Sequence, residues 1–439
     1  MVFYTHTLTP RIQYIIDFFA ARLFNNPIEI VTNPDVYKAS QSPKINYSDT
    51  SLSHDEFVIH PVELLFQKSV NQVKIDCQII NDHKAFFFTS GDFPFDIFAA
   101  SFYLLSRYEE YLNHEKDIFG RFDHTQSLAY QENFLNTPVI ECWILAFKES
   151  LIKRFPSLTF KTVVPESLLT YDIDMAYSYR DKGLVKTIGG ISRSIVDKDL
   201  SNLWDRFKVL AGKAKDPYDC YEWLDSLHTR YTIRPYMFFL VAAKQKGYDK
   251  NIQRDSLLMK ELISHYSIRS NIGIHPSWQS GDNNNLLQEE KTWLEKECSV
   301  KITRSRQHFI RFTLPETYRN LIAAGIKEDF SMGYGTVNGF RASVSAPFFW
   351  YDLAGENATN LLIYPFCYMD ANSYFELKHT PEEAYRELVS LWESIRKVNG
   401  VFVSIWHNNI LSSAHEFSGW RQLLMKFLEM VHRKNNNQN

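Results

Sequence analysis

The 439-residue sequence has few cysteines, no excess of basic residues and no long apolar segment. Its five cysteines are scattered, and no two have the spacing of a metal knuckle, so neither a disulfide framework nor a zinc finger is expected. Lysine and arginine together number 48, against 51 aspartate and glutamate residues, which gives a formal charge of −3. This balance argues against a general binder of nucleic acids or anionic membranes.

No run of about 18 uncharged apolar residues occurs, so no membrane span is expected. The N-terminal segment also lacks the pattern of a secretion signal, because Arg11, Asp17 and Arg22 interrupt its apolar residues. Those apolar residues recur at helical spacing and predict an amphipathic helix over 10–24. We therefore expect a cytoplasmic protein.

The length predicts two domains, and a content of 45% hydrophobic and 15% aromatic residues is ample for their cores. A mixed α/β domain is expected over 1–160, followed by a larger domain over 161–432. A polar, basic stretch near 181–215 is interpreted as a helical insertion in the larger domain. The low-complexity tail, 433–439, is expected to be disordered.

An amphipathic pattern over 95–112 predicts one long helix in the N-terminal domain. This segment carries Arg107, Glu109 and Glu110 near its end. We interpret the two glutamates as part of a solvated face.

After residue 160 the pattern changes to strands that alternate with helices over about seven units. Such alternation predicts parallel strands joined by crossover helices, in a barrel or a doubly wound sheet. The first strand, "LLTYDID", ends with Asp172 and Asp174. Residues i and i+2 of a strand share a face, so the carboxylates repel unless a cation, a proton or a partner separates their roles.

Polar residues also follow the later strands of this pattern, namely His275, His308, Arg341, Asp370 and His407. The carboxyl ends of the strands of a parallel barrel form a common mouth, where the chemistry of such folds takes place. Mixed aspartate and histidine ligands favour zinc, nickel, cobalt or iron over magnesium and calcium.

One division of roles explains the two carboxylates. Asp174 binds the metal, and Asp172 takes a proton from the attacking water. Arg341 would pair with Asp172 and keep it ionised. A histidine across the mouth would then protonate the leaving group.

Aromatic residues lie beside these motifs, and their faces suit stacking against the apolar face of a sugar ring. Trp278, Tyr334 and Trp406 are the candidates for substrate binding. The expected partner is therefore a carbohydrate or another N-acetylated small molecule, and no oligomeric state is assigned.

Four segments resemble the motifs of the polysaccharide deacetylases of carbohydrate esterase family 4. They are "LLTYDID", "IGIHPSW", "GFRASVSAPF" and "VFVSIWHN", and the resemblance covers about residues 165–410. The whole chain is similar to a bacterial subgroup of polysaccharide deacetylase-like proteins with an added N-terminal domain. The resemblance implies an irregular seven-stranded (β/α) barrel and metal-dependent hydrolysis of an N-acetyl group from a sugar.

Carried over position by position, the resemblance makes Asp172 the base and His407 the acid. It makes Asp174 and His275 metal ligands, and Arg341 the residue that orients the base. Asp370 is a further catalytic candidate.

The sequence departs from the family pattern at two places near the metal ligands. Ile173 separates the two aspartates, which are adjacent in the family. Gln279 stands where the family carries a second histidine. We infer that His308, at the end of the neighbouring strand, replaces that ligand.

The expected activity is removal of an N-acetyl group from a sugar or glycan, with zinc as the metal and nickel or cobalt as alternatives. A metal-independent amidohydrolase of the same fold, similar to allantoinase, is the first alternative. A glycan-binding protein with a decayed catalytic mouth is the second.

Overall fold

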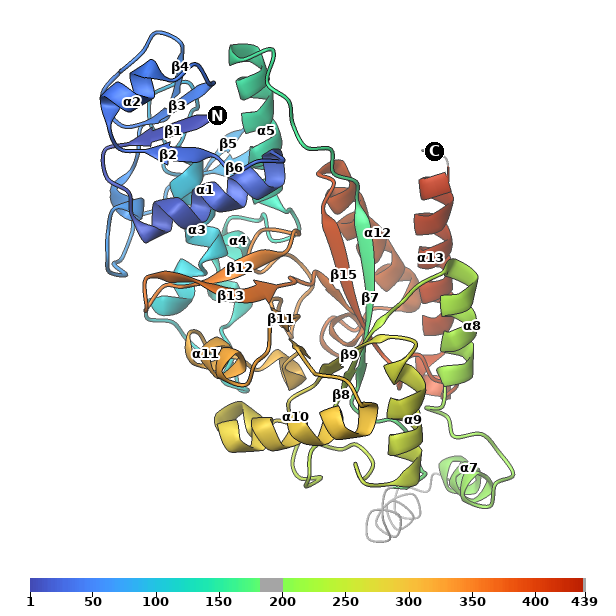
Figure 1. The fold of residues 1–439 in the computed structure, drawn as a ribbon. Coiled ribbons are helices and arrows are strands. Elements are labelled where there is room, and N and C mark those ends of the chain that lie inside the picture. Colours follow the sequence, from blue (N-terminus) through green and yellow to red (C-terminus); the bar gives the residue numbers. More distant parts are fainter. Residues whose placement is uncertain (182–199, 437–439) are drawn as a thin grey trace.

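The computed structural model describes residues 1–181 and 200–436, which form an α/β structure with two main sheets (Figure 1). The smaller sheet lies near the N-terminus and has the order β2-β1-β3-β4, with every pair parallel. Its strands are β1 (Val2–Thr5), β2 (Glu29–Val31), β3 (Lys44–Tyr47) and β4 (Glu56–Val58). A separate antiparallel hairpin joins β5 (Gln78–Ile80) to β6 (His83–Ala85).

The N-terminal region also contains five α-helices, and the first confirms the helix predicted over 10–24. It begins with Pro10 at its first position, and the side chain of Thr9 accepts a hydrogen bond from the backbone N–H of Ile12, which caps the helix. The five are α1 (Pro10–Leu23), α2 (Pro34–Ala39), α3 (Ile97–Leu105), α4 (Leu128–Gln131) and α5 (Val139–Arg154).

The larger sheet has the order β12-β13-β11-β10-β9-β8-β7-β15-β14. All its pairs are parallel except β12–β13. Its strands are β7 (Glu166–Ile173), β8 (Tyr236–Phe239), β9 (Asn271–Ile274), β10 (Arg304–Ser305), β11 (Glu328–Asp329), β12 (Phe348–Asp352), β13 (Asn357–Ile363), β14 (Tyr368–Met369) and β15 (Val401–His407).

The α/β class is therefore confirmed. The larger sheet has nine strands among the described residues, where seven were expected, and β12 and β13 form an antiparallel hairpin. The end strands β12 and β14 form no pair with each other in the described part of the chain. Closure of the sheet into a barrel stays a prediction.

Helices connect most of the parallel strands and surround the larger sheet (Figure 1). They are α8 (Tyr221–Tyr231), α9 (Leu257–Ser267), α10 (Asn284–Cys298), α11 (Glu316–Ala323), α12 (Pro381–Lys397) and α13 (Trp420–Asn436). No helix among the described residues is long and apolar enough to cross a bilayer.

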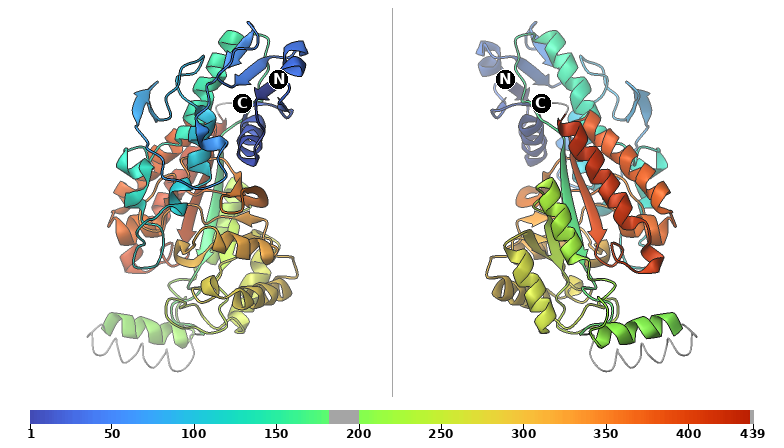
Figure 2. Two further views of the ribbon diagram at one scale, coloured as in Figure 1. Left: turned by 90° about the vertical axis from the view of Figure 1, so that its left-hand side faces the viewer. Right: turned by 90° about the vertical axis from the view of Figure 1, so that its right-hand side faces the viewer.

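The insertion predicted near 181–215 lies partly outside the described residues, which omit 182–199. Its second part contains helix α7 (Leu200–Leu210). Figure 2 shows α7 and the N-terminal sheet at opposite ends of the molecule. Helix α13 extends to Asn436 and so includes the first residues of the tail predicted to be disordered; that prediction stays untested, and residues 437–439 lie outside the described part of the chain.

The single helix predicted over 95–112 is interrupted at Arg107, whose backbone is left-handed with φ 54° and ψ 45°. Helix α3 ends at Leu105, and a short 3-10 helix spans Tyr108–Tyr111. The prediction that Glu109 and Glu110 face solvent is wrong, because both are buried.

The buried Glu110 joins the N-terminal region to the larger sheet. It accepts hydrogen bonds from Arg107 Nε at 2.7 Å and from Arg341 Nε and Nη2 at 2.9 and 2.7 Å. Burial alone would raise the pKa of Glu110, but Arg341 and Arg107 outweigh it and lower the pKa to about 2. The loss of one partner would leave buried charge without compensation.

We predict that Glu110→Gln lowers the free energy of unfolding by about 3 to 5 kcal/mol, measured by chemical denaturation. The folded pKa of Glu110 lies below its ordinary value of 4.5. The contribution of Glu110 to stability is therefore complete above pH 4.5 and is lost as the pH falls toward about 2. The matched control, Glu149→Gln at an exposed position, should change stability by less than about 0.5 kcal/mol. Equal stability of the two variants would refute this account of the network.

Candidate active site

The pairing of β7 with β15 places two of the predicted catalytic residues side by side. The strands are parallel, and Asp172 lies opposite His407 in the register. Both side chains are buried at the carboxyl end of the sheet. Asp174 follows directly beyond the end of β7, where its carboxylate is partly exposed.

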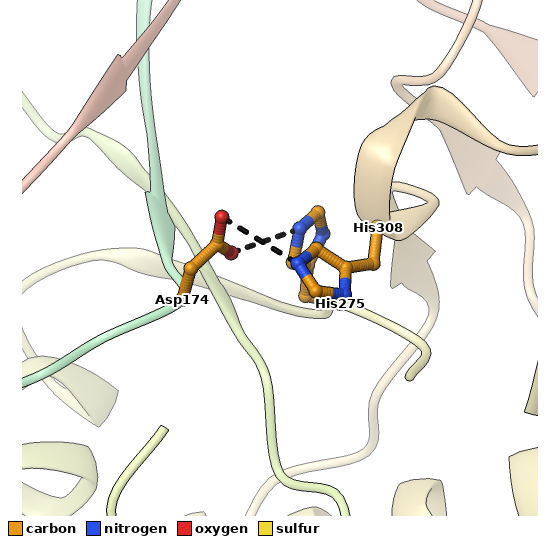
Figure 3. A group of neighbouring side chains, drawn as sticks. All are labelled: Asp174, His275 and His308. Atoms are coloured by element: carbon orange, nitrogen blue, oxygen red, sulfur yellow. Dashed lines mark ion pairs between the residues drawn. The ribbon is translucent and has the colours of Figure 1, made fainter. Parts of the chain in front are cut away.

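Asp174 faces two histidines from the next strands of the sheet (Figure 3). His275 directly follows β9, and His308 lies three residues beyond β10. The Nε2 atom of His275 is 3.1 Å from Asp174 Oδ1, and that of His308 is 3.7 Å from Asp174 Oδ2. One ligand atom from each residue lies within 4.8 Å of the others.

Hydrogen bonds on the far side of each imidazole fix these orientations. His275 Nδ1 lies 2.6 Å from the carbonyl oxygen of Arg306, and His308 Nδ1 lies 3.0 Å from Asp249 Oδ1. Because both partners are acceptors, each Nδ1 carries the hydrogen, and Nε2 of the neutral ring directs its lone pair toward Asp174.

The three residues fit a divalent metal. Two nitrogen lone pairs and a carboxylate converge, and Asp174 Oδ1 is a buried oxygen without a hydrogen-bond partner in the described structure. Burial alone would lower the pKa of His275, but Asp172 and Asp174 outweigh it and raise the pKa. The surroundings thus favour a positive charge, and the donor set suits zinc and related transition metals.

The prediction that Arg341 pairs with Asp172 is wrong. Arg341 is bound by Glu110 and by the carbonyl oxygen of Gly333. Arg306 takes the place beside the aspartate, and its Nη1 donates to Asp172 Oδ1 at 2.8 Å. The sequence offered one signal for Arg306, because it directly follows β10 and lies two residues before His308.

His407 is held by Asp370, which follows β14. Asp370 Oδ1 lies 2.6 Å from His407 Nδ1, and Asp370 Oδ2 accepts from the backbone N–H of His407 at 2.8 Å. The Nε2 atom of His407 lies 4.0 Å from Asp172 Oδ2 and 3.7 Å from Asp174 Oδ2. Burial would lower the pKa of His407, but Asp370 outweighs it and raises the pKa to about 9.

A cavity of about 360 Å³ opens in front of these residues. Its wall includes Asp172, Asp174, His275, His308 and His407, together with the aromatic residues Tyr248, Phe309 and Phe375. The cavity is large enough for a small polar group and its flanking ring.

The three aromatic residues predicted to bind substrate do not line this cavity. Trp406 points to the opposite face of β15 from His407, where it is buried against Tyr368. Tyr334 is buried, and its hydroxyl accepts from Arg107. Trp278 packs behind Tyr248, with ring centroids 4.3 Å apart.

Comparisons with known proteins give one family model that matches the N-terminal region and distant likenesses among solved structures. Residues 1–156 match a family of unknown function, DUF7033. No curated protein matches the chain in sequence.

Among solved structures, the chain is similar to a protein assigned as a polysaccharide deacetylase from Mycobacterium smegmatis. The two share 14% sequence identity with a TM-score of 0.40, and the match covers 62% of this chain and 85% of the other. An allantoinase gives 10% identity, a TM-score of 0.40 and the same coverage of 62% and 85%. A protein assigned as a polysaccharide deacetylase from Pseudomonas aeruginosa gives 11% identity, a TM-score of 0.39 and coverage of 62% and 86%. At these identities and scores, the likenesses assign neither an activity nor a substrate to this chain.

We predict that Asp249→Asn weakens zinc binding by about 10- to 100-fold, because the carboxylate orients His308 and increases its basicity. Metal affinity can be measured by competition with a chromophoric chelator. Asp255→Asn, at an exposed position outside the cavity, is the matched control and should bind zinc as the wild type does. Equal zinc affinity of the Asp249 variant and the control would contradict a role of Asp249 in holding His308 as a ligand.

Proposed function

We propose that the chain is a metal-dependent hydrolase that removes an N-acetyl group from a sugar or glycan. The observation that carries this proposal is the contrast between two carboxylates that are two residues apart. Asp172 is paired with a guanidinium, whereas Asp174 faces two imidazole nitrogens. This contrast gives one carboxylate the surroundings of a base and the other those of a metal ligand.

Asp174, His275 and His308 would hold the metal, for which zinc is our first choice and nickel or cobalt the alternatives. When bound, such an ion polarises a carbonyl group and lowers the pKa of water. The protein's own part is to fix the two histidines through Arg306 and Asp249, as their Nδ1 contacts indicate.

Asp172 would act as the general base. Its Oδ1 is held by Arg306, while its Oδ2 faces His275 and His407 at 3.9 and 4.0 Å. That free oxygen is the atom that would accept a proton from the attacking water. Arg306 is a positioning residue in this scheme, because it acts through Asp172.

His407 would act as the general acid toward the leaving amine. Its raised pKa of about 9 keeps the imidazole protonated at neutral pH. Asp370 binds Nδ1, so Nε2 is the atom left to donate a proton into the cavity. Asp370 is therefore a positioning residue rather than a group that touches the substrate.

We also propose that the larger sheet is an irregular (β/α) barrel and that the chain divides into two domains near residue 160. The small sheet lies entirely before this point, and β7 begins shortly after it. The family match that ends at residue 156 supports the same division.

The two aspartates allow a direct test with zinc-loaded protein and a tetramer of N-acetylglucosamine, measuring released acetate and bound metal. Asp172→Asn should keep zinc and lower the rate by about 10²- to 10⁴-fold, the range that general-base catalysis supplies. Asp174→Asn should lose both zinc and activity. Asp255→Asn should retain both, because Asp255 lies outside the cavity.

Other outcomes would contradict the proposal. Acetate release that survives removal of zinc would support a metal-independent amidohydrolase. Sugar binding without hydrolysis in the zinc-loaded protein would support a glycan-binding protein. An unchanged rate in Asp172→Asn would remove this residue from the reaction.

The pH dependence tests the pairing of His407 with Asp370. Because the acid must be protonated, the rate should fall as the pH rises through about 9. Asp370→Asn removes the charge that raises this pKa, so the alkaline limb should move to lower pH by roughly 1 to 3 pH units. An alkaline limb at the same pH in both proteins would exclude His407 as the titrating acid.

A further inference from the structure

A loop of the N-terminal region contributes a charged side chain to the wall of the cavity. Arg121 lines the cavity together with the candidate metal ligands, yet it precedes β7 by about 45 residues. Its side chain is 5% exposed. The proposed mechanism gives this buried guanidinium no task.

Two of the three guanidinium nitrogens are held in place. Arg121 Nε donates to Asp117 Oδ2 at 2.6 Å, and Nη1 donates to the carbonyl oxygen of Phe309 at 2.7 Å. Asp117 Oδ1 also accepts from the backbone N–H of Phe119 and Arg121, both at 2.9 Å, which orders the loop. A Cβ on Gly335 would lie 2.0 Å from Nη1, so glycine leaves the room that this guanidinium occupies.

The third nitrogen is a spare donor. Arg121 Nη2 is buried and has no hydrogen-bond partner within the described residues. A buried donor of this kind costs free energy unless a ligand satisfies it. Because Nε and Nη1 already have partners, Nη2 is the nitrogen of Arg121 that lacks one within the described residues.

Most charged residues of the cavity wall already have a partner, and Arg121 itself is paired with Asp117, which does not line the cavity. Lys250 also lines the cavity and forms no ion pair with a residue of the described chain. Asp172 is already paired with Arg306, and Asp174 faces the two histidines. Glu376 is the remaining acidic residue of the wall and is exposed.

We propose that Arg121 forms a subsite for a negatively charged oxygen of the substrate, so that this chain acts on an anionic N-acetylated sugar. The choice of an N-acetylated substrate rests on the proposed function, whereas the choice of a negatively charged one rests on Arg121 alone. Guanidinium groups bind carboxylate and phosphate oxygens through strong charge-assisted hydrogen bonds. The N-terminal region would thereby set substrate specificity.

The test compares the binding of three sugars to zinc-loaded protein by calorimetry. N-acetylglucosamine is neutral, N-acetylmuramic acid carries a carboxylate, and N-acetylglucosamine 6-phosphate carries a phosphate. At least one anionic sugar should bind roughly 10- to 100-fold more tightly than the neutral one, as expected for a hydrogen bond to a charged group. The anionic sugar that binds more tightly shows whether the subsite prefers a carboxylate or a phosphate group.

Variants locate the preference. Arg121→Gln should remove the preference for the anion, so that neutral and anionic sugars bind with similar affinities, while Arg121→Lys should restore part of the preference. Asp117→Asn keeps an acceptor for the loop but removes a competing negative charge, so the anion should bind at least as tightly as to the wild type. Arg254→Gln, outside the cavity, is the matched control and should behave as the wild type.

Equal binding of neutral and anionic sugars to the wild type would overturn the inference. So would an equal loss of both affinities in Arg121→Gln, or a weaker anion affinity in Asp117→Asn, because these results indicate a merely structural role. Acetate release measured in parallel separates the two proposals. Hydrolysis without a charge preference refutes the subsite alone, and charge-selective binding without hydrolysis refutes the proposed function alone.

Discussion

Repulsion between Asp172 and Asp174 at the end of β7 is the constraint on which the candidate site depends. The structure meets it by giving each carboxylate a different partner. Arg306 pairs with Asp172 at 2.8 Å, and two imidazole Nε2 atoms face Asp174. Both histidines are held at Nδ1, so the arrangement is built before any substrate enters.

The N-terminal region takes part in this arrangement rather than lying apart from it. Its Glu110 binds Arg341, whereas Arg306 is the guanidinium beside Asp172. Its loop also places Arg121 in the cavity wall. The buried ion pairs of Glu110 and the cavity-lining Arg121 thus come from the same region of the chain.

The sequence predicted the alternation of strands and helices, and it placed polar residues at the strand ends, because both follow from local periodicity. It did not predict which charges pair across the molecule. Arg341 and Glu110 are 231 residues apart, and nothing in their local patterns indicates that they meet. Trp406 was misplaced for a simpler reason, since neighbouring residues of a strand face opposite sides, and His407 already faces the cavity. The roles of the site residues stay predictions.

The most direct test of the central claim is anomalous X-ray scattering at the zinc edge from crystals of the zinc-loaded protein. The account predicts one strong anomalous peak within bonding distance of Asp174, His275 and His308, at about 2.0 to 2.2 Å from their ligand atoms. A peak at another position would contradict the account. So would the absence of a peak in a structure where Asp174 forms hydrogen bonds directly to the histidines.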